Sequence, residues 1–165
     1  MRSRTLPLVV FVVCALAACK GGDSVKDDLL AYESIATENI GTAMKLRDQF
    51  SILMQGAKGR TEAEVVAIGV RIADQLLPQL DAHAKAVEDF KPSTDPVRAL
   101  HAKYLGVARA HREAVAEMGA GIERKDDAAV ASAQQKLGAW RTAVASWETE
   151  WKVLRKAHGL PAIAP

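Results

Sequence analysis

The sequence has few of the residues on which site chemistry usually depends. Aromatic residues make up only 5% of the 165-residue chain, and it contains two cysteines, Cys14 and Cys19. Both cysteines fall in or just after an apolar run near the N-terminus. The rest of the chain therefore has neither a disulfide nor a cysteine metal ligand to organise it.

Catalytic and cofactor-binding motifs are also missing from the sequence. It has no Cys-x-x-Cys-His for covalent c-type haem, no Glu-x-x-His pair of the di-iron bundle type, no glycine-rich phosphate loop and no serine in a glycine elbow. The acidic residues are interleaved with lysine and arginine, as is typical of solvated helix faces. The sequence therefore predicts that the protein is not an enzyme.

Long apolar runs are absent except at the N-terminus. There, Arg2 and Arg4 precede an apolar run over residues 6–18. A membrane-spanning helix needs about 20 apolar residues, so this run is too short for a permanent anchor. Its charged start and short apolar centre are typical of a secretory signal, which is cleaved off.

The run closes with Leu16-Ala17-Ala18-Cys19, which resembles the lipobox of bacterial lipoproteins. The resemblance implies cleavage before Cys19 and lipidation of that residue by a diacylglyceryl thioether and an amide-linked acyl chain. Cys14 fits this motif worse, because a bulky valine precedes it. Each buried methylene contributes about 0.8 kcal/mol, so two or more acyl chains hold a protein stably on a membrane.

The lipobox divides the chain into four expected parts. These are a signal peptide (1–18), the lipidated cysteine with a flexible glycine tether (19–23), a folded domain (24–159) and a C-terminal tail (160–165). Lys20 after the cysteine resembles outer-membrane sorting in enteric bacteria. We therefore expect a periplasm-facing protein of the cell envelope, on the outer membrane in preference to the inner one in a Gram-negative cell.

The basic excess of the chain belongs to the signal peptide. The chain has 22 lysines and arginines against 20 acidic residues, and Arg2 and Arg4 leave with the signal, so the mature chain has a formal charge of about zero. A nucleic-acid-binding protein would show a clustered positive excess. The expected partners are therefore the membrane, through the lipid anchor, and a protein of the envelope, but no nucleic acid.

The mature sequence has helical periodicity throughout. Apolar residues recur at steps of three and four in the segments 24–56, 61–90, 95–122 and 126–158. The second segment starts at Thr61-Glu62-Ala63-Glu64, the pattern of a capping box. Because short connections force neighbouring helices to run antiparallel, the predicted fold is all-α, an up-down-up-down antiparallel four-helix bundle. Beyond this generic bundle, the mature domain resembles no family.

Pro78 interrupts the second segment. Proline cannot donate to the carbonyl four residues before it, and its ring crowds that carbonyl. The apolar seam nevertheless continues from Leu76 to Leu80. We therefore expect a kink rather than a break into two helices.

The last segment carries all three tryptophans on one seam. Trp140, Trp147 and Trp151 follow one another at helical spacing. Small residues opposite large ones are how a bundle accommodates indole rings, so we interpret the tryptophans as core and expect Trp140 to be largely buried. The alternative is a wall that faces a ligand.

The histidines offer a second candidate for chemistry. Folding the second and third segments about their short connection places His83 near His101 and Tyr104, and brings Glu33 and Trp147 to the same level. Imidazole and carboxylate groups bind zinc, copper or iron, so His83, His101 and Glu33 are candidate metal ligands, with Tyr104 and Trp147 facing a ligand. The plainer interpretation is that these histidines are hydrogen-bonded or half-exposed and that the protein has no cofactor.

The sequence leaves two functions open. The first is a lipid-anchored envelope protein whose bundle is a binding or scaffold module without catalytic activity. The second is an envelope carrier of a transition metal, a b-type haem held without covalent bonds, or another ligand, which would use the layer at His83 and His101.

Overall fold

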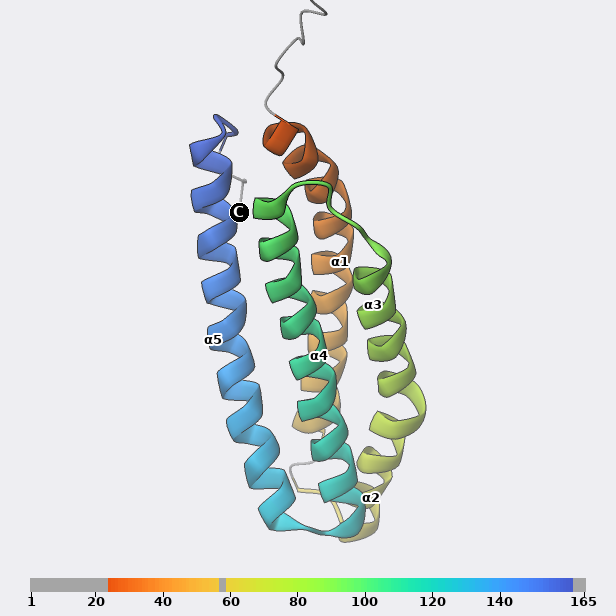
Figure 1. The fold of residues 1–165 in the computed structure, drawn as a ribbon. Coiled ribbons are helices and arrows are strands. Elements are labelled where there is room, and N and C mark those ends of the chain that lie inside the picture. Colours follow the sequence, from red (N-terminus) through yellow and green to blue (C-terminus); the bar gives the residue numbers. More distant parts are fainter. Residues whose placement is uncertain (1–23, 57–58, 162–165) are drawn as a thin grey trace, which may run out of the picture.

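The computed structural model describes residues 24–56 and 59–161 of the chain. The regular elements in this part are all helical: α1 (Ser24–Gln55), α2 (Glu62–Arg71), η1 (Ile72–Leu76), α3 (Leu77–Asp89), α4 (Asp95–Arg124) and α5 (Asp127–Ala157). Because α2, η1 and α3 follow one another without a gap, they form one of four long helical segments, which pack closely together (Figure 1). The predicted all-α class is confirmed.

The predicted N-terminal features lie outside the described residues. This applies to the signal peptide (1–18) and to Cys19 with its tether (19–23), as well as to residues 162–165 of the tail. Within the described ranges, the helices include none that is both long and apolar enough to cross a membrane.

Helix ends follow from the local sequence. The Thr61 hydroxyl accepts a bond from the Glu64 N–H, and the Glu64 carboxylate accepts the Thr61 N–H at 2.8 Å, so α2 begins with the predicted capping box. Asp126 caps α5 by accepting the Ala129 N–H at 3.0 Å. Helix α4 ends at Lys125, whose φ of 55° is left-handed and stops the helix.

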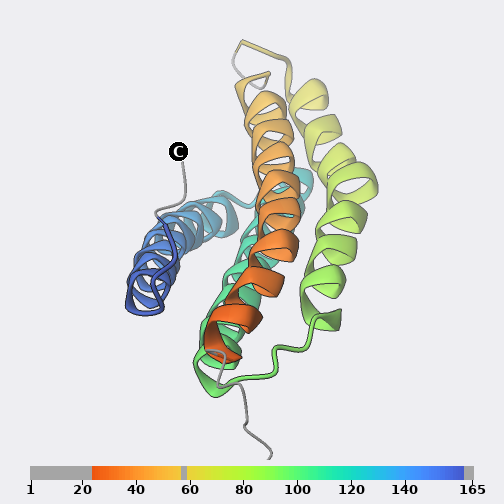
Figure 2. The same cartoon turned by 90° about the horizontal axis from the view of Figure 1, so that it is seen from above.

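Pro78 is accommodated by one turn of π-helix. The Leu77 N–H bonds to the Ile72 carbonyl, five residues back, which widens the helix just before the proline. The Gln79 side chain then donates to the Gln75 carbonyl at 2.6 Å. As expected, the helix does not break into two separate helices at this point (Figure 2).

Helix α4 is the central element of the fold. It packs against α1, α2, η1, α3 and α5, whereas α5 packs mainly against α4. Figures 1 and 2 show α5 beside α4, on the side away from α2 and α3. The backbones of α5 and α1 therefore do not approach each other closely, and side chains fill only part of the space between them.

Two clusters of buried side chains form the core. The aliphatic cluster lies toward the α4–α5 turn and comprises Leu46, Ile68, Ile72, Leu76, Leu80, Ala114, Val115, Met118, Ile122, Ala133 and Leu137. The aromatic cluster lies toward the α3–α4 connection and comprises Leu29, Tyr32, Ala36, Val87, Val97, Leu100, Tyr104, Trp147 and Trp151.

In the aliphatic cluster, α2 and α4 meet backbone to backbone at two glycines. A Cβ atom on Gly69 would lie 2.7 Å from the Gly119 carbonyl oxygen and 2.8 Å from the Glu123 nitrogen. A Cβ atom on Gly119 would lie 2.7 Å from Cγ2 of Ile72. These glycines therefore set the spacing of the two helices.

In the aromatic half, the buried Asp28 carboxylate ties α1 to the α3–α4 connection. It accepts the Ser93 N–H at 3.1 Å, the Thr94 N–H at 2.8 Å and the Thr94 hydroxyl at 2.6 Å. Burial raises the pKa of Asp28, but the bonds from Thr94 and Ser93 together outweigh burial and bring the pKa below its ordinary value. The connection is thus held by an ionised carboxylate.

Candidate functional site

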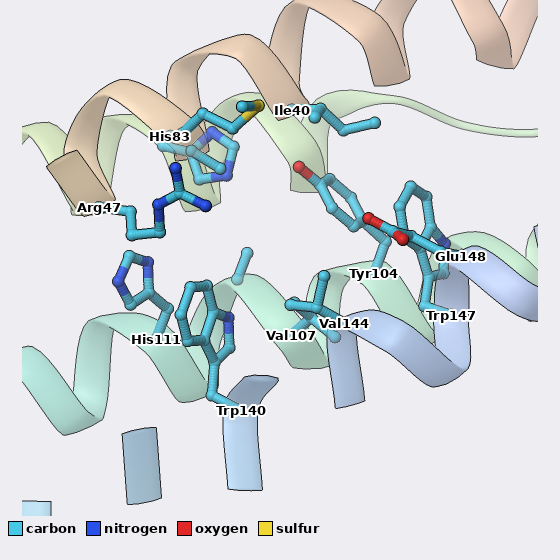
Figure 3. Close-up of a pocket in the computed structure, with 13 residues that line it drawn as sticks. Ile40, Arg47, His83, Tyr104, Val107, His111, Trp140, Val144, Trp147 and Glu148 are labelled. Atoms are coloured by element: carbon cyan, nitrogen blue, oxygen red, sulfur yellow. The ribbon is translucent and has the colours of Figure 1, made fainter. Parts of the chain in front are cut away.

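A cavity of about 210 Å³ lies where the two clusters meet, with α1 and α5 on opposite sides of it (Figure 3). A cavity of about 150 Å³ admits benzene, and pockets for drug-sized molecules start near 300 Å³, so this one suits a small molecule. Every long helical segment contributes to its walls, which consist of Ile40, Ala43, Met44, Arg47, His83, Tyr104, Val107, Ala108, His111, Trp140, Val144, Trp147 and Glu148.

One end of the cavity carries nitrogen atoms. Figure 3 shows the Arg47 guanidinium and the rings of His83 and His111 at this end, coming from α1, α3 and α4. The His111 ring stacks on Trp140, with centroids 4.1 Å apart and planes 9° from parallel. His111 is 3% exposed, and its Nε2 atom is buried without a hydrogen-bond partner.

Burial keeps both of these histidines neutral at pH 7. It lowers the pKa of His111 to about 4, with a smaller contribution from repulsion by His83. Burial likewise lowers the pKa of His83. The imidazoles therefore offer this end of the cavity hydrogen bonds without a fixed charge.

Arg47 supplies the fixed positive charge at the same end. Its guanidinium pairs with Asp48 at 2.8 Å, and the two side chains are 50% and 60% exposed. A surface pair of this kind contributes only about 0 to 1 kcal/mol. The guanidinium can therefore turn toward a ligand at little cost.

Tyr104 lies toward the opposite end, and Figure 3 shows its hydroxyl pointing back toward His83 and Ile40. Tyr104 is 5% exposed, and its Oη atom has no hydrogen-bond partner. Its ring lies 4.6 Å from that of Trp147 and meets the His83 ring edge-on. A buried polar group without a partner costs about 1 to 3 kcal/mol, so a ligand atom bonded to Tyr104 would stabilise the site.

The cavity brings His83, Tyr104 and Trp147 together, as the sequence predicts, but not the other predicted site residues. His101 lies against the rings of Tyr32 and Phe90, with centroids 5.7 and 5.5 Å away. It is absent from the cavity wall.

Glu33 is bound to an arginine. Its carboxylate forms an ion pair with the Arg155 guanidinium, whose side chain is 4% exposed and also donates to the Pro161 carbonyl at 2.8 Å. In the described part of the chain, histidine, cysteine, aspartate and glutamate form no group of three or more that could hold a metal. The predicted layer of His83, His101 and Glu33 is thus not assembled. His101 packs against the Tyr32 ring instead, and Glu33 is paired with Arg155.

Comparisons of this chain with protein-family models, curated proteins and solved structures find no match. The function is therefore inferred from the geometry of the cavity and from the sequence.

Sequence reasoning did not count Arg47 and His111 among the candidate site residues. Trp140 packs against the aliphatic cluster, as the core interpretation expects, and in addition lines the cavity. A signal for His111 exists, because it follows Tyr104 by two helical turns and lies on the same face of α4. Arg47 gives no such signal, since it sits among other exposed residues of α1.

Proposed function

We propose that this protein is a lipid-anchored binding protein of the bacterial cell envelope, whose helical bundle holds a small ligand in the central cavity. The observation that carries this proposal is that three residues of a largely apolar cavity wall each have a buried polar atom without a partner: Tyr104 Oη, His111 Nε2 and Trp147 Nε1. Buried polar groups are normally hydrogen-bonded, so these residues favour a guest toward which the side chains turn and which supplies the missing bonds.

Binding without catalysis fits the composition of the cavity wall. In the described part of the chain, the residues that line it include no serine, threonine or cysteine to act as a nucleophile. His111 is stacked on an indole ring rather than bonded to an orienting carboxylate. The proposal is accordingly a carrier or sensor, not an enzyme.

The proposal includes an up-down-up-down antiparallel order of the four long helical segments. The connections between Gln55 and Glu62, Asp89 and Asp95, and Arg124 and Asp127 are short, which supports this order. A small ligand is favoured over a protein partner because the cavity lies inside the bundle, whereas the exposed large apolar residues are few: three on α1 and one each on α2 and α5 in the described chain.

Anchoring at Cys19 is tested by lipid labelling and membrane fractionation of the full chain. Cys19→Ser should abolish both, because the lipobox resemblance makes Cys19 the acylated residue. Cys14→Ser is the matched control and should leave both intact. Labelling that persists without Cys19 would overturn the lipoprotein proposal.

Ligand binding is tested by NMR with phenylacetamide, a small neutral aromatic probe. The indole N–H signals of Trp140 and Trp147, which line the cavity, should shift more than that of Trp151, which does not. Val144→Phe should abolish the shifts by filling the cavity. Val153→Phe, on the exposed side of the same helix, should leave them unchanged. Shifts that are absent, or that survive Val144→Phe, would contradict binding in this cavity.

A further inference from the structure

The charges of the cavity wall are unequally distributed along it. Among the described residues that line it, Arg47 and Glu148 are the only two of a charged type, since burial lowers the pKa of His83 and of His111 and keeps both neutral. Figure 3 shows Arg47 at the end with the two histidines, and Glu148 at the other end beside Tyr104 and Trp147. A bound molecule would therefore meet positive charge at one end and negative charge at the other.

The nitrogen-rich end suits a single negative charge. A guanidinium matches the two oxygens of a carboxylate in a bidentate pair, which is stronger than a bond between neutral groups. The buried Nε2 atom of His111, on the same end of the cavity, lacks a partner and can donate to an anion in the appropriate tautomer. A dianion would leave one charge uncompensated, because Arg47 is the one cation among the described residues of this wall.

The body of the cavity suits an aromatic ring. Its walls include the stacked pair of His111 and Trp140 and the tilted pair of Tyr104 and Trp147. Aromatic pairs with centroids about 4.5 to 7 Å apart are favourable beyond their buried area, and a rigid ring loses little entropy on binding. At about 210 Å³, the cavity exceeds the roughly 150 Å³ that admits benzene, which leaves room for one small substituent.

We propose that the ligand is a small aromatic monocarboxylate, held with its carboxylate between Arg47 and His111 and its ring toward Tyr104. This inference rests on the proposed function. It adds that the cavity prefers a negatively charged ligand to a neutral one of the same shape, and that Arg47 is responsible for this preference. A polar substituent on the ligand's aromatic ring would meet the hydroxyl of Tyr104.

The test compares phenylacetate with its neutral counterpart phenylacetamide at pH 7, with the indole signals of Trp140 and Trp147 as the readout. Phenylacetate should bind about tenfold more tightly, the usual gain from a hydrogen bond to a charged group. Arg47→Gln should remove this preference by weakening phenylacetate binding about tenfold, with little change for phenylacetamide. Arg47 is half-exposed, so the variant should fold, which thermal melting will verify.

Lys45→Gln is the matched control, since it removes the same charge from an exposed position of α1 outside the cavity wall. It should leave both affinities within a factor of about two. Equal binding of the two probes would overturn the carboxylate inference and leave the proposed function standing. A preference that survives Arg47→Gln would overturn the role of Arg47. If neither probe shifts the two indole signals, the proposed function itself fails.

Discussion

The two halves of the core fill the space between the helices in different ways. In the aliphatic cluster, Gly69 and Gly119 let two backbones touch, and branched side chains fill the remaining space. In the aromatic cluster, large rings such as those of Trp147 and Trp151 fill the space between the helices. The aromatic half also buries polar atoms without partners, among them Trp151 Nε1 and Tyr104 Oη.

This difference explains where the cavity lies. Aliphatic side chains have several rotamers and can fill irregular space, whereas rigid rings cannot collapse into a gap that does not match their shape. Where one kind of packing gives way to the other, α1 and α5 stand apart and a void remains. A binding site can thus arise from a mismatch within the core, without a dedicated loop.

The largest expected effect concerns the indole rings. Trp147→Ala should lower the free energy of unfolding by about 3 to 5 kcal/mol, as for other buried aromatic residues, because Trp147 is 2% exposed. Trp140→Ala should lower it by only about 1 to 2 kcal/mol, since one side of that ring already faces the cavity. Urea denaturation measures both values, and equal losses would show that Trp140 is packed as tightly as Trp147.

The next effect tests the backbone contact of the aliphatic cluster. Gly69→Ala should lower the free energy of unfolding by about 1 to 3 kcal/mol, because the new methyl group meets backbone atoms that cannot rotate away.

The matched control for Gly69→Ala is Gly106→Ala in α4, where a Cβ atom would meet no other atom within 4 Å. This change should raise the free energy of unfolding by about 0.5 to 1 kcal/mol, through the higher helix propensity of alanine. Thermal or urea unfolding measures both variants. If both changes raise stability, α2 and α4 are further apart than the structure places them.

The third effect is the stability that the protein loses at acidic pH through the buried His111. Burial lowers the pKa of His111 to about 4, whereas the unfolded chain has a value near 6.5. Between these values the unfolded state binds more protons, so stability falls as the pH drops through 6.5, and the loss levels off below pH 4. The contribution of His111 between pH 7 and pH 5 should be about 2 kcal/mol.

Urea unfolding of the wild type and of His111→Gln at several pH values isolates this contribution. His83 and His101 also have lowered pKa values, so the wild type loses stability through all three histidines. The free energy of unfolding of the variant should still fall with pH through His83 and His101, but without the contribution of His111. Parallel profiles of the two proteins would show that His111 is more hydrated than the structure indicates.

The smallest effect concerns the hydrogen bonds that Asp28 accepts from Ser93 and Thr94. Asp28→Asn should lower the free energy of unfolding at pH 7 by about 1 kcal/mol, because the α3–α4 connection loses a charged acceptor. The folded-state pKa of Asp28 is lowered, so its contribution is present above the unfolded value of about 3.9 and disappears as the pH falls through the folded value.

Chemical unfolding at neutral and acidic pH measures this difference. Asp27→Asn, in the exposed neighbouring residue, is the control and should change stability by only a few tenths of a kcal/mol. If Asp28→Asn is less stable than the wild type by the same amount in strong acid as at pH 7, the Asp28 carboxylate does not hold the connection in its ionised form.

The sequence by itself determined the helices of this protein. Periodicity places all four long segments, and the capping box at Thr61 marks the start of α2. The helical continuation past Pro78 was also predictable, since the apolar seam extends beyond it. These features depend on interactions between residues a few positions apart, which the chain order alone specifies.

Only the tertiary structure decided which polar side chains share a cavity. His101 and His111 lie on either side of Tyr104 along α4, and both are buried, yet only His111 lines the cavity. Ten residues separate them, about 15 Å along the helix axis, so the register of α4 against α1 and α5 decides which of the two faces the cavity. That register is set by the contact at Gly69 and Gly119 and by the packing of large rings, which involve residues far apart in the sequence.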